Sequence, residues 1–225
     1  MKKPGVTRWW WVRHGPVAGP PGRILGQLDP AAELSGQEHR IAALRRILPQ
    51  QAYSVSSSLR RARDTARALG TPEPALEPGL NEQHFGQWQG LTHDEVARLY
   101  PADWRRVWAA PEGEAPTGGE SFSQLLRRVA DTIESISALT EESISALTDA
   151  EDIVVVAHAG TIRAALALAL ELRPERGLAF VVDPLSVTRI DRLISDAGEI
   201  GYRLPYVNFD PALPIGAKHP NSSPS

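Results

Sequence analysis

The chain has 225 residues, a formal net charge of −3 and no cysteine. A chain of this length fits one domain that can bury a core without covalent staples, and the missing cysteine excludes disulfides, thiolate metal sites and a cysteine nucleophile. The net negative charge argues against binding to nucleic acid. No apolar run approaches the roughly 18 residues of a membrane span. Without a recognisable signal peptide, we expect a cytoplasmic protein that has neither a nucleic acid nor a membrane as partner.

The first third of the chain alternates the patterns of strands and helices. Short, uninterrupted runs of β-forming apolar residues at 7–12 and 52–56 predict two buried strands. A loop rich in Gly and Pro covers 15–30, and a helical pattern follows each strand, up to about residue 48 and over 59–69. This order of elements favours parallel strands that are connected by crossover helices.

Three stretches have the form of a capping box, in which a Ser or Thr and a Glu or Gln three residues later bond the first N–H groups of a helix. They predict helices that begin near residue 36, cover 92–100, and extend from about 121 to at least Leu139. The three boxes are Ser35-Gly36-Gln37-Glu38, Thr92-His93-Asp94-Glu95 and Ser121-Phe122-Ser123-Gln124.

The middle of the chain differs from both ends. Residues 80–91 mix polar and aromatic types without a period, a further helical turn or two is expected over 103–110, and 111–119 predict a loop. We therefore expect a mostly helical insertion at about 80–120 within a single domain that spans residues 1–210.

The C-terminal part predicts more strands than helices. Residues 153–157 are the clearest strand of the chain, and a helix over 161–170 follows. The end of the chain from 211 to 225, rich in Pro, Ser and small residues, predicts a flexible tail. Further strands are expected at 178–182, 186–193 and 201–207, the last two joined by a hairpin turn at Asp196-Ala197-Gly198.

A tandem octapeptide occupies residues 134–149, where Glu-Ser-Ile-Ser-Ala-Leu-Thr-Glu is followed by Glu-Ser-Ile-Ser-Ala-Leu-Thr-Asp. Eight residues rotate a helix by about 80° beyond two full turns, so the apolar stripe drifts instead of forming a coiled-coil seam. The repeat favours a local duplication that lengthens a helix or its exit loop. An interaction surface is the alternative.

Two histidines follow the two best strands directly. Arg13-His14-Gly15 comes after 7–12, and His158 comes after 153–157. A stretch with several arginines, including Arg61, leaves the second strand and enters a helix. Because ligands of open α/β sheets bind beyond the carboxyl ends of the strands, these side chains are expected to meet at one edge.

Each of these features alone has an ordinary explanation, as a polar residue in a loop or a solvated helix face. Together, at three strand ends, they favour an anion site with a nucleophile, and phosphate is the favoured anion. Helix N-termini near Leu59 and Thr161 would add backbone N–H groups and positive dipole ends to that site.

Five segments, in this order along the chain, give a wider resemblance. The chain resembles the histidine phosphatase superfamily, in its phosphoglycerate-mutase-like branch. The resemblance implies an α/β fold, a three-layer α/β/α sandwich with a mostly parallel central sheet, and a site that needs no metal and no cofactor. The segments are Val-Arg-His-Gly at 12–15, Ser-Leu-Arg-Arg-Ala-Arg-Asp-Thr-Ala at 58–66, Leu-Asn-Glu-Gln-His-Phe-Gly-Gln-Trp-Gln-Gly at 80–90, Gly-Gly-Glu-Ser at 118–121 and Val-Val-Ala-His-Ala-Gly at 155–160.

The resemblance also implies roles for the matching residues. His14 is expected to be the nucleophile that becomes a phosphohistidine, with its other ring nitrogen held by a backbone carbonyl. Arg13 and Arg61 are expected to clamp the phosphate. His158 would donate to the transferring group, and Glu82 would protonate the leaving oxygen and then activate water.

Around these residues, the resemblance implies that Asn81, Gln83, His84 and Phe85 shape the pocket. Residue 159 is Ala where the family usually has Gly, and the backbone N–H of Ala159 would still serve as a phosphate donor. The three other histidines, His39, His93 and His219, lie outside the motifs and are interpreted as surface or structural residues.

The loop after His14 departs from the family pattern. Many members continue with Glu-Thr or Glu-Ser, whereas this chain has Pro16-Val17, and residues 18–25 lack the Asn and Gln that often contact phosphate. Gln27 is a candidate substitute for these contacts.

The short connection between Glu82 and Glu120 is similar to the phosphatase branch, and the segments at 80–88 and 116–122 are similar to α-ribazole phosphatases of cobalamin biosynthesis. The sequence therefore predicts a phosphomonoesterase acting on a small phosphorylated metabolite, with α-ribazole 5'-phosphate as a candidate. A mutase-type isomerase and a non-catalytic module that binds a phospho-ligand are the alternatives, and the sequence leaves a homodimer open.

Overall fold

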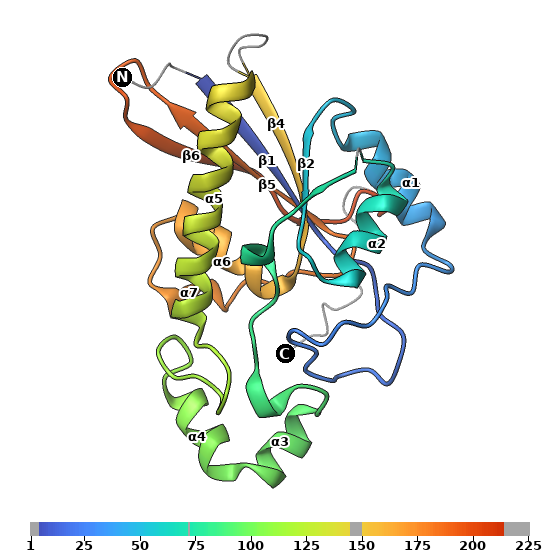
Figure 1. Ribbon diagram of the computed structural model, residues 1–225, viewed down its shortest axis with the longest axis vertical. Coiled ribbons are helices and arrows are strands. Elements are labelled where there is room, and N and C mark those ends of the chain that lie inside the picture. Colours follow the sequence, from blue (N-terminus) through green and yellow to red (C-terminus); the bar gives the residue numbers. More distant parts are fainter. Residues whose placement is uncertain (1–4, 72, 145–149, 214–225) are drawn as a thin grey trace.

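A single mixed sheet forms the centre of the molecule (Figure 1). The computed structural model describes residues 5–71, 73–144 and 150–213. The six strands have the order β3-β2-β4-β1-β5-β6, and β3, β2, β4 and β1 are mutually parallel. β5 pairs antiparallel with both β1 and β6. The sheet is thus mostly parallel, as expected from the sequence.

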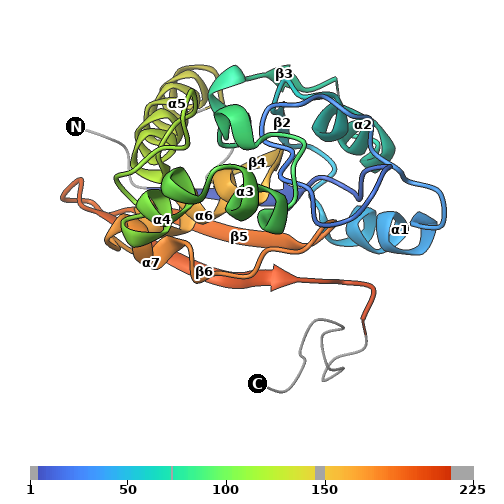
Figure 2. The same ribbon diagram turned by 90° about the horizontal axis from the view of Figure 1, so that it is seen from below.

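Helices cover both faces of this sheet. α1 and α2 pack on one face, and α5 and α6 pack on the other (Figures 1 and 2), which gives the expected α/β/α sandwich. The strands are β1 (Gly5–Arg13), β2 (Tyr53–Ser56), β3 (Ala75–Leu76), β4 (Ala150–Ala157), β5 (Val187–Ile194) and β6 (Ile200–Phe209). The helices are α1 (Glu38–Ile47), α2 (Arg60–Leu69), α3 (His93–Leu99), α4 (Pro101–Ala109), α5 (Phe122–Ile144), α6 (Ala159–Ala169) and α7 (Pro174–Gly177), with 3₁₀ turns η1 (Pro78–Leu80) and η2 (Gly86–Trp88).

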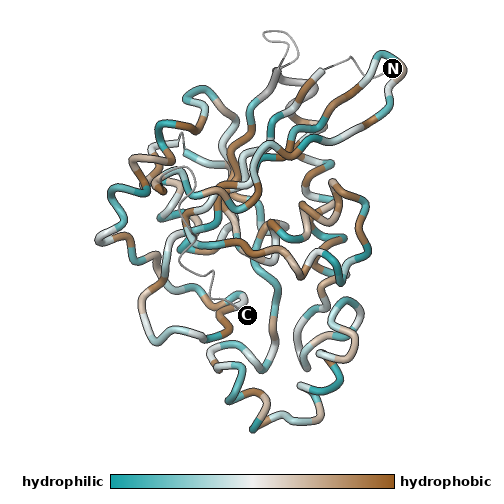
Figure 3. The backbone as a smooth tube through the Cα atoms, turned by 180° about the vertical axis from the view of Figure 1, so that it is seen from behind, coloured by the Kyte–Doolittle hydropathy of each residue, from teal (hydrophilic) through white to brown (hydrophobic). Residues whose placement is uncertain are grey.

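Burial on both faces explains why the central strands are apolar without interruption. In β1, Trp9 and Trp11 face the core under α5 and α6, whereas Trp10 and Val12 face the core under α1 and α2. β4 alternates in the same way between the two cores. Figure 3 shows hydrophobic stretches along the strands near the middle of the molecule and hydrophilic stretches around the periphery.

The helices α3 and α4 lie beyond the carboxyl ends of the parallel strands (Figure 1). They surround a small core of their own, in which Ile24, Trp88, Val96 and Val107 are buried. The two helices correspond to the helix predicted over 92–100 and the further turns predicted over 103–110. The capping box of Thr92 and Glu95 is present at the start of α3, and Ser121 and Gln124 exchange the same two bonds at the start of α5.

The capping box expected at Ser35 is wrong. α1 begins at Glu38 with Gln37 as its N-cap, and no side chain caps it. The backbone of Gly36 takes a positive φ of 74°, and its N–H bonds the Glu38 carboxylate at 3.1 Å. The chain therefore turns at Gly36, and Ser35 stands too early to cap the helix.

The strand expected at 178–182 is also wrong. This segment follows the short helix α7 as turn and coil, although Leu178, Phe180 and Val182 pack against the core under α6. The apolar run therefore reflects burial alone. The strands expected at 186–193 and 201–207 are confirmed as β5 and β6, joined by a turn in which Gly198 N–H bonds Ser195 O at 2.8 Å.

α5 includes the first octapeptide and the start of the second, up to Ile144, which agrees with a duplication that lengthens a helix. The rest of the repeat and most of the expected tail, from residue 214 on, lie outside the described residues. Within the described ranges, no helix is long and apolar enough to span a membrane.

Candidate active site

Adjacent parallel strands bring the two motif histidines together. Arg13 at the end of β1 is paired with Ala157 at the end of β4, so His14 and His158 leave the sheet side by side. Their ring centroids are 5.0 Å apart. β2 ends beside β4, and its continuation leads through Ser57 into α2, which carries Arg61. The three strand ends meet at one edge, as expected from the sequence.

The hydrogen bonds of His14 define its tautomer. Nε of Arg61, which always carries a proton, donates to Nε2 of His14 at 3.2 Å. Nε2 must therefore be the unprotonated acceptor, and the ring proton is on Nδ1, 2.6 Å from the carbonyl oxygen of Gly15. A neutral imidazole with a lone pair on Nε2 is the form that a nucleophilic histidine requires.

Burial keeps His14 in this neutral form. Its side chain is buried, and desolvation, reinforced by the charges of Arg13 and Arg61, holds its pKa well below the usual range. Burial likewise lowers the pKa of His158, and His14 and the neighbouring arginines lower it further.

Arg61 is 1% exposed, and its three nitrogens are all engaged. Besides the bond to His14, NH1 donates to the Leu28 carbonyl at 2.6 Å and NH2 donates to the Gly26 carbonyl at 2.7 Å. Burial lowers the pKa of Arg61, and the carboxylate of Glu82 opposes this effect. Arg61 therefore fixes the loop after β1 and the imidazole of His14 at the same time.

His158 is fully buried and belongs to a second network. Its Nε2 lies 2.7 Å from the hydroxyl of Ser57, which also accepts the N–H of Leu59 at 3.1 Å. The Ser57 hydroxyl in turn lies 2.9 Å from Oδ1 of Asn81. This network holds Nε2 of His158, whose ring centroid lies 5.0 Å from that of His14, and His158 itself does not line the cleft.

Two buried polar atoms of the site have no internal bond. Nε of Arg13 and Nδ1 of His158 lack a hydrogen-bond partner within the part of the chain that the structure describes. Because buried polar atoms are nearly always paired in native proteins, two such atoms at one strand edge indicate a site built for a polar ligand.

The carboxylate of Glu82 lies at the start of α6. Its oxygens accept the N–H of Gly160 at 3.3 Å and of Gln83 at 2.9 Å. A Cβ at position 160 would lie only 2.3 Å from Oε1 of this carboxylate, so a side chain there would displace the Glu82 carboxylate.

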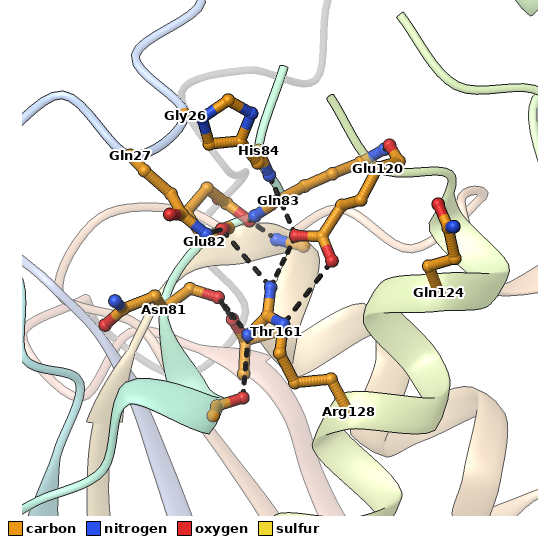
Figure 4. Close-up of polar contacts among 12 residues, drawn as sticks. Gly26, Gln27, Asn81, Glu82, Gln83, His84, Glu120, Gln124, Arg128 and Thr161 are labelled. Carbon is orange, nitrogen blue, oxygen red and sulfur yellow. Dashed lines mark hydrogen bonds and ion pairs between the residues drawn. The ribbon is translucent and has the colours of Figure 1, made fainter. Parts of the chain in front are cut away.

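Arg128 of α5 holds the loop that carries Glu82 (Figure 4). Its NH1 donates to the carbonyls of Gly79 and Asn81 at 2.7 and 2.9 Å, and its NH2 donates to the carboxylate of Glu120 at 2.6 Å. Glu120 also accepts the N–H of His84 at 2.9 Å. The motif glutamate at 120 thus acts on the loop, not on the cleft.

A cleft of about 650 Å³ opens at this edge of the sheet. Arg13, His14, Arg61 and Glu82 line its floor, together with residues of the loop 16–26 and of α3, α4 and α6. Gln83 and Phe85 also line it, as expected.

Besides His158, four other expected site residues do not line the cleft. Gln27 donates to the Glu82 carbonyl at 3.1 Å and so acts as a tether between two loops. Asn81 bonds Ser57 and Ser58 instead, while His84 and Ala159 lie outside the lining.

The sequence analysis missed Arg163, which lines the cleft from α6. Its Nε donates to the Phe180 carbonyl at 2.7 Å, as NH1 of Arg13 does to the Val182 carbonyl at 2.5 Å. Burial lowers the pKa of Arg163, and Glu82 opposes the effect. The sequence did offer one signal for this role, because Arg163 is a single arginine inside an otherwise apolar helix segment.

The fold and the site have counterparts among known proteins. Residues 9–196 match the profile of the histidine phosphatase superfamily, branch 1. The chain is 37% identical over 172 residues to a glucosyl-3-phosphoglycerate phosphatase of Mycolicibacterium vanbaalenii, covering 74% of this chain and 76% of the relative. It is 32% identical over 177 residues to the adenosylcobalamin/α-ribazole phosphatase of Salmonella typhimurium, covering 73% and 80%.

Among solved structures, a mycobacterial glucosyl-3-phosphoglycerate phosphatase in complex with inorganic phosphate superimposes with a TM-score of 0.75. It has 30% sequence identity, and the match covers 92% of this chain and 99% of that protein. The similarity therefore extends over nearly the whole fold, including the edge where the cleft lies.

The lowered pKa values of the two histidines predict an acid-sensitive fold. Below pH of about 6.5 the unfolded chain binds protons on His14 and His158, whereas the folded protein keeps both neutral, so the free energy of unfolding falls as the pH falls. Replacing His158 with Gln should reduce this slope between pH 6.5 and 5 by up to about 1.4 kcal/mol per pH unit. Urea titrations at each pH measure this slope. The control is His39→Gln, which replaces an exposed histidine. Parallel curves for wild type and His158→Gln would contradict a neutral His158.

Proposed function

The chain belongs to the histidine phosphatase superfamily, and on this basis we propose that it hydrolyses a small phosphomonoester through a phosphohistidine on His14. The observation that carries the proposal is the contact between Arg61 and His14, since it leaves the attacking lone pair on the nitrogen that neighbours the cationic floor of the cleft. The intact set of Arg13, His14, Arg61, Glu82 and His158 argues against a module that only binds.

The first half-reaction transfers the phosphoryl group to the enzyme. Arg61 releases Nε2 when its N–H turns to a phosphate oxygen, which is a charged and stronger acceptor. Nε2 of His14 then attacks phosphorus, and the bond from phosphorus to the alcohol oxygen breaks. Protonated Glu82 gives its proton to that oxygen.

The second half-reaction returns the site to its starting state. Glu82, now a carboxylate, takes a proton from a water molecule, and the water oxygen attacks phosphorus. The bond from phosphorus to Nε2 breaks, so that His14 is neutral again and inorganic phosphate leaves. Charge on the transferring group is balanced by Arg13, Arg61 and Arg163, the neutral imidazole of His158 lies beside His14, and no metal is needed in this scheme.

Arg163 is our candidate for the phosphate contact that the loop 16–25 lacks. Among the residues that the structure describes, its Nε alone bonds the protein backbone, at Phe180, and the side chain reaches the cleft from the helix that follows His158. Gln27, the candidate from the sequence, is held by the Glu82 carbonyl.

The substrate is the finer part of the proposal. Relatives are named for glucosyl-3-phosphoglycerate and for α-ribazole phosphate, and α-ribazole 5'-phosphate, hence a role in cobalamin biosynthesis, stays a candidate for this chain. A mutase-type isomerase would release no phosphate, which distinguishes the alternative directly. We also propose a cytoplasmic location and a single domain over residues 1–210 with an insertion at about 80–120. A homodimer is the proposed assembly, and measurement of the molecular mass in solution tests it.

The His14→Ala variant should lose phosphatase turnover, because no other group in the cleft replaces the nucleophile. We expect release of inorganic phosphate from p-nitrophenyl phosphate to fall by a factor of about 10³ or more, and acid-quenched wild type, but not the variant, to carry labelled phosphohistidine. His39→Ala is the control. Undiminished hydrolysis by a folded His14→Ala variant would overturn the mechanism.

Arg163→Met should lower kcat/KM by roughly 10², the effect of losing one preorganised donor to the transferring group. The inhibition constant for inorganic phosphate should rise as well, because the contact is to phosphate itself. Arg176→Met removes an exposed arginine of α7 and is the matched control. An unchanged phosphate inhibition constant in Arg163→Met would exclude the contact.

A further inference from the structure

The wall of the cleft opposite the sheet is aromatic. His93 of α3 and Trp104 and Trp108 of α4 contact one another, with ring centroids 5.3 to 6.1 Å apart and tilts of 51° to 65°. His93 and Trp108 line the cleft, and Trp104 supports them from behind. No step of the proposed phosphoryl transfer uses these rings.

Trp108 is 50% exposed, which is an unusual position for the largest apolar side chain. Its neighbour in the helix, Val107, is 7% exposed and provides the packing of α4. An exposed aromatic side chain beside a cleft is typical of a binding surface.

The aromatic wall is held rigidly. Trp88, 1% exposed, packs against Trp104 with centroids 5.6 Å apart, and its indole N–H donates to Asp103 at 2.9 Å. Asp103 also accepts the N–H of Thr117 at 3.1 Å, which fastens α4 to the loop before α5. A preformed wall loses little conformational entropy when a ligand binds.

The rest of the cleft mouth is mostly uncharged. Prolines of the loop after His14 and of the segment after α4 line it, with Phe85 beside them. The cleft volume of about 650 Å³ lies in the range of roughly 300–1,000 Å³ in which whole metabolite-sized ligands are enclosed. A phosphate on the floor of the cleft leaves most of this space for the leaving alcohol.

We propose that this slot binds a ring of the leaving alcohol by stacking against Trp108 and His93, so that the substrate is the phosphomonoester of a ring-bearing alcohol. The inference rests on the proposed phosphatase function and names its substrate class. Flat ring faces gain from offset or edge contacts with aromatic side chains. A cationic group is disfavoured because Arg13, Arg23, Arg61 and Arg163 all line the cleft.

Phosphonates test the slot without turnover, since their carbon–phosphorus bond is not hydrolysed. Calorimetric titration of wild-type protein compares benzylphosphonate, cyclohexylmethylphosphonate and propylphosphonate. We expect at least one ring compound to bind about tenfold more tightly than the propyl compound. This factor corresponds to the free energy of one aromatic contact together with the apolar area that it buries. Tighter binding of the benzyl compound indicates an aromatic ring, and tighter binding of the cyclohexyl compound indicates a saturated ring such as a sugar.

Variants then locate the effect. Trp108→Ala should abolish most of the preference for a ring, and Trp108→Phe should keep it. Leu99→Ala, which removes an apolar side chain that is 49% exposed on α3 and does not line the cleft, should leave the preference unchanged.

Equal affinities of the three phosphonates for wild type, or a ring preference that survives in Trp108→Ala, would overturn the slot. The proposed function fails separately, if wild-type protein binds the phosphonates but releases no phosphate from benzyl phosphate or propyl phosphate. Binding of none of the three compounds would overturn the slot as well.

Discussion

The site depends on one buried contact, from the guanidinium of Arg61 to the imidazole of His14. A cation that is 1% exposed is costly unless its donors are bonded, and here two backbone carbonyls of the loop after β1 and one ring nitrogen accept them. The position of the loop, the tautomer of the nucleophile and the charge of the cleft floor are therefore set together. Glu82 is the carboxylate that most favours the charged forms of Arg13, Arg61 and Arg163.

Supporting residues place the remaining groups around this contact. Arg128 and Glu120 hold the loop that presents Glu82, and Ser57 with Asn81 holds His158. Both networks connect elements that are distant in the sequence, so each resists local movement of the side chain that it positions. Nε of Arg13 and Nδ1 of His158 have no partner among the described residues, and they mark the end of the preorganised site where a polar ligand would bind.

Much of this arrangement followed from the sequence, because strand ends have local signals. The apolar runs at 7–12 and 153–157 predicted neighbouring strands, and so placed His14 beside His158. The segment 178–182 misled the prediction because its side chains are buried, whereas its backbone carbonyls bond arginines instead of a strand: Phe180 accepts from Arg163, and Val182 accepts from Arg13. The aromatic wall depends on tertiary contacts that no local pattern encodes, and the only local signal for Arg163 was its position as a single arginine in an otherwise apolar helix segment.

The aromatic wall and the cationic floor divide the cleft into two parts, one for the leaving alcohol and one for the phosphoryl group. Attack by Nε2 on phosphorus requires His14 to be a neutral imidazole with its proton on Nδ1. Nitrogen-15 NMR of histidine-labelled protein tests this requirement directly. We predict that Nε2 of His14 gives the signal of an unprotonated, hydrogen-bonded nitrogen that does not change between pH 7.5 and 5. A protonated Nε2, or a titration midpoint near the ordinary histidine value of about 6.5, would contradict it.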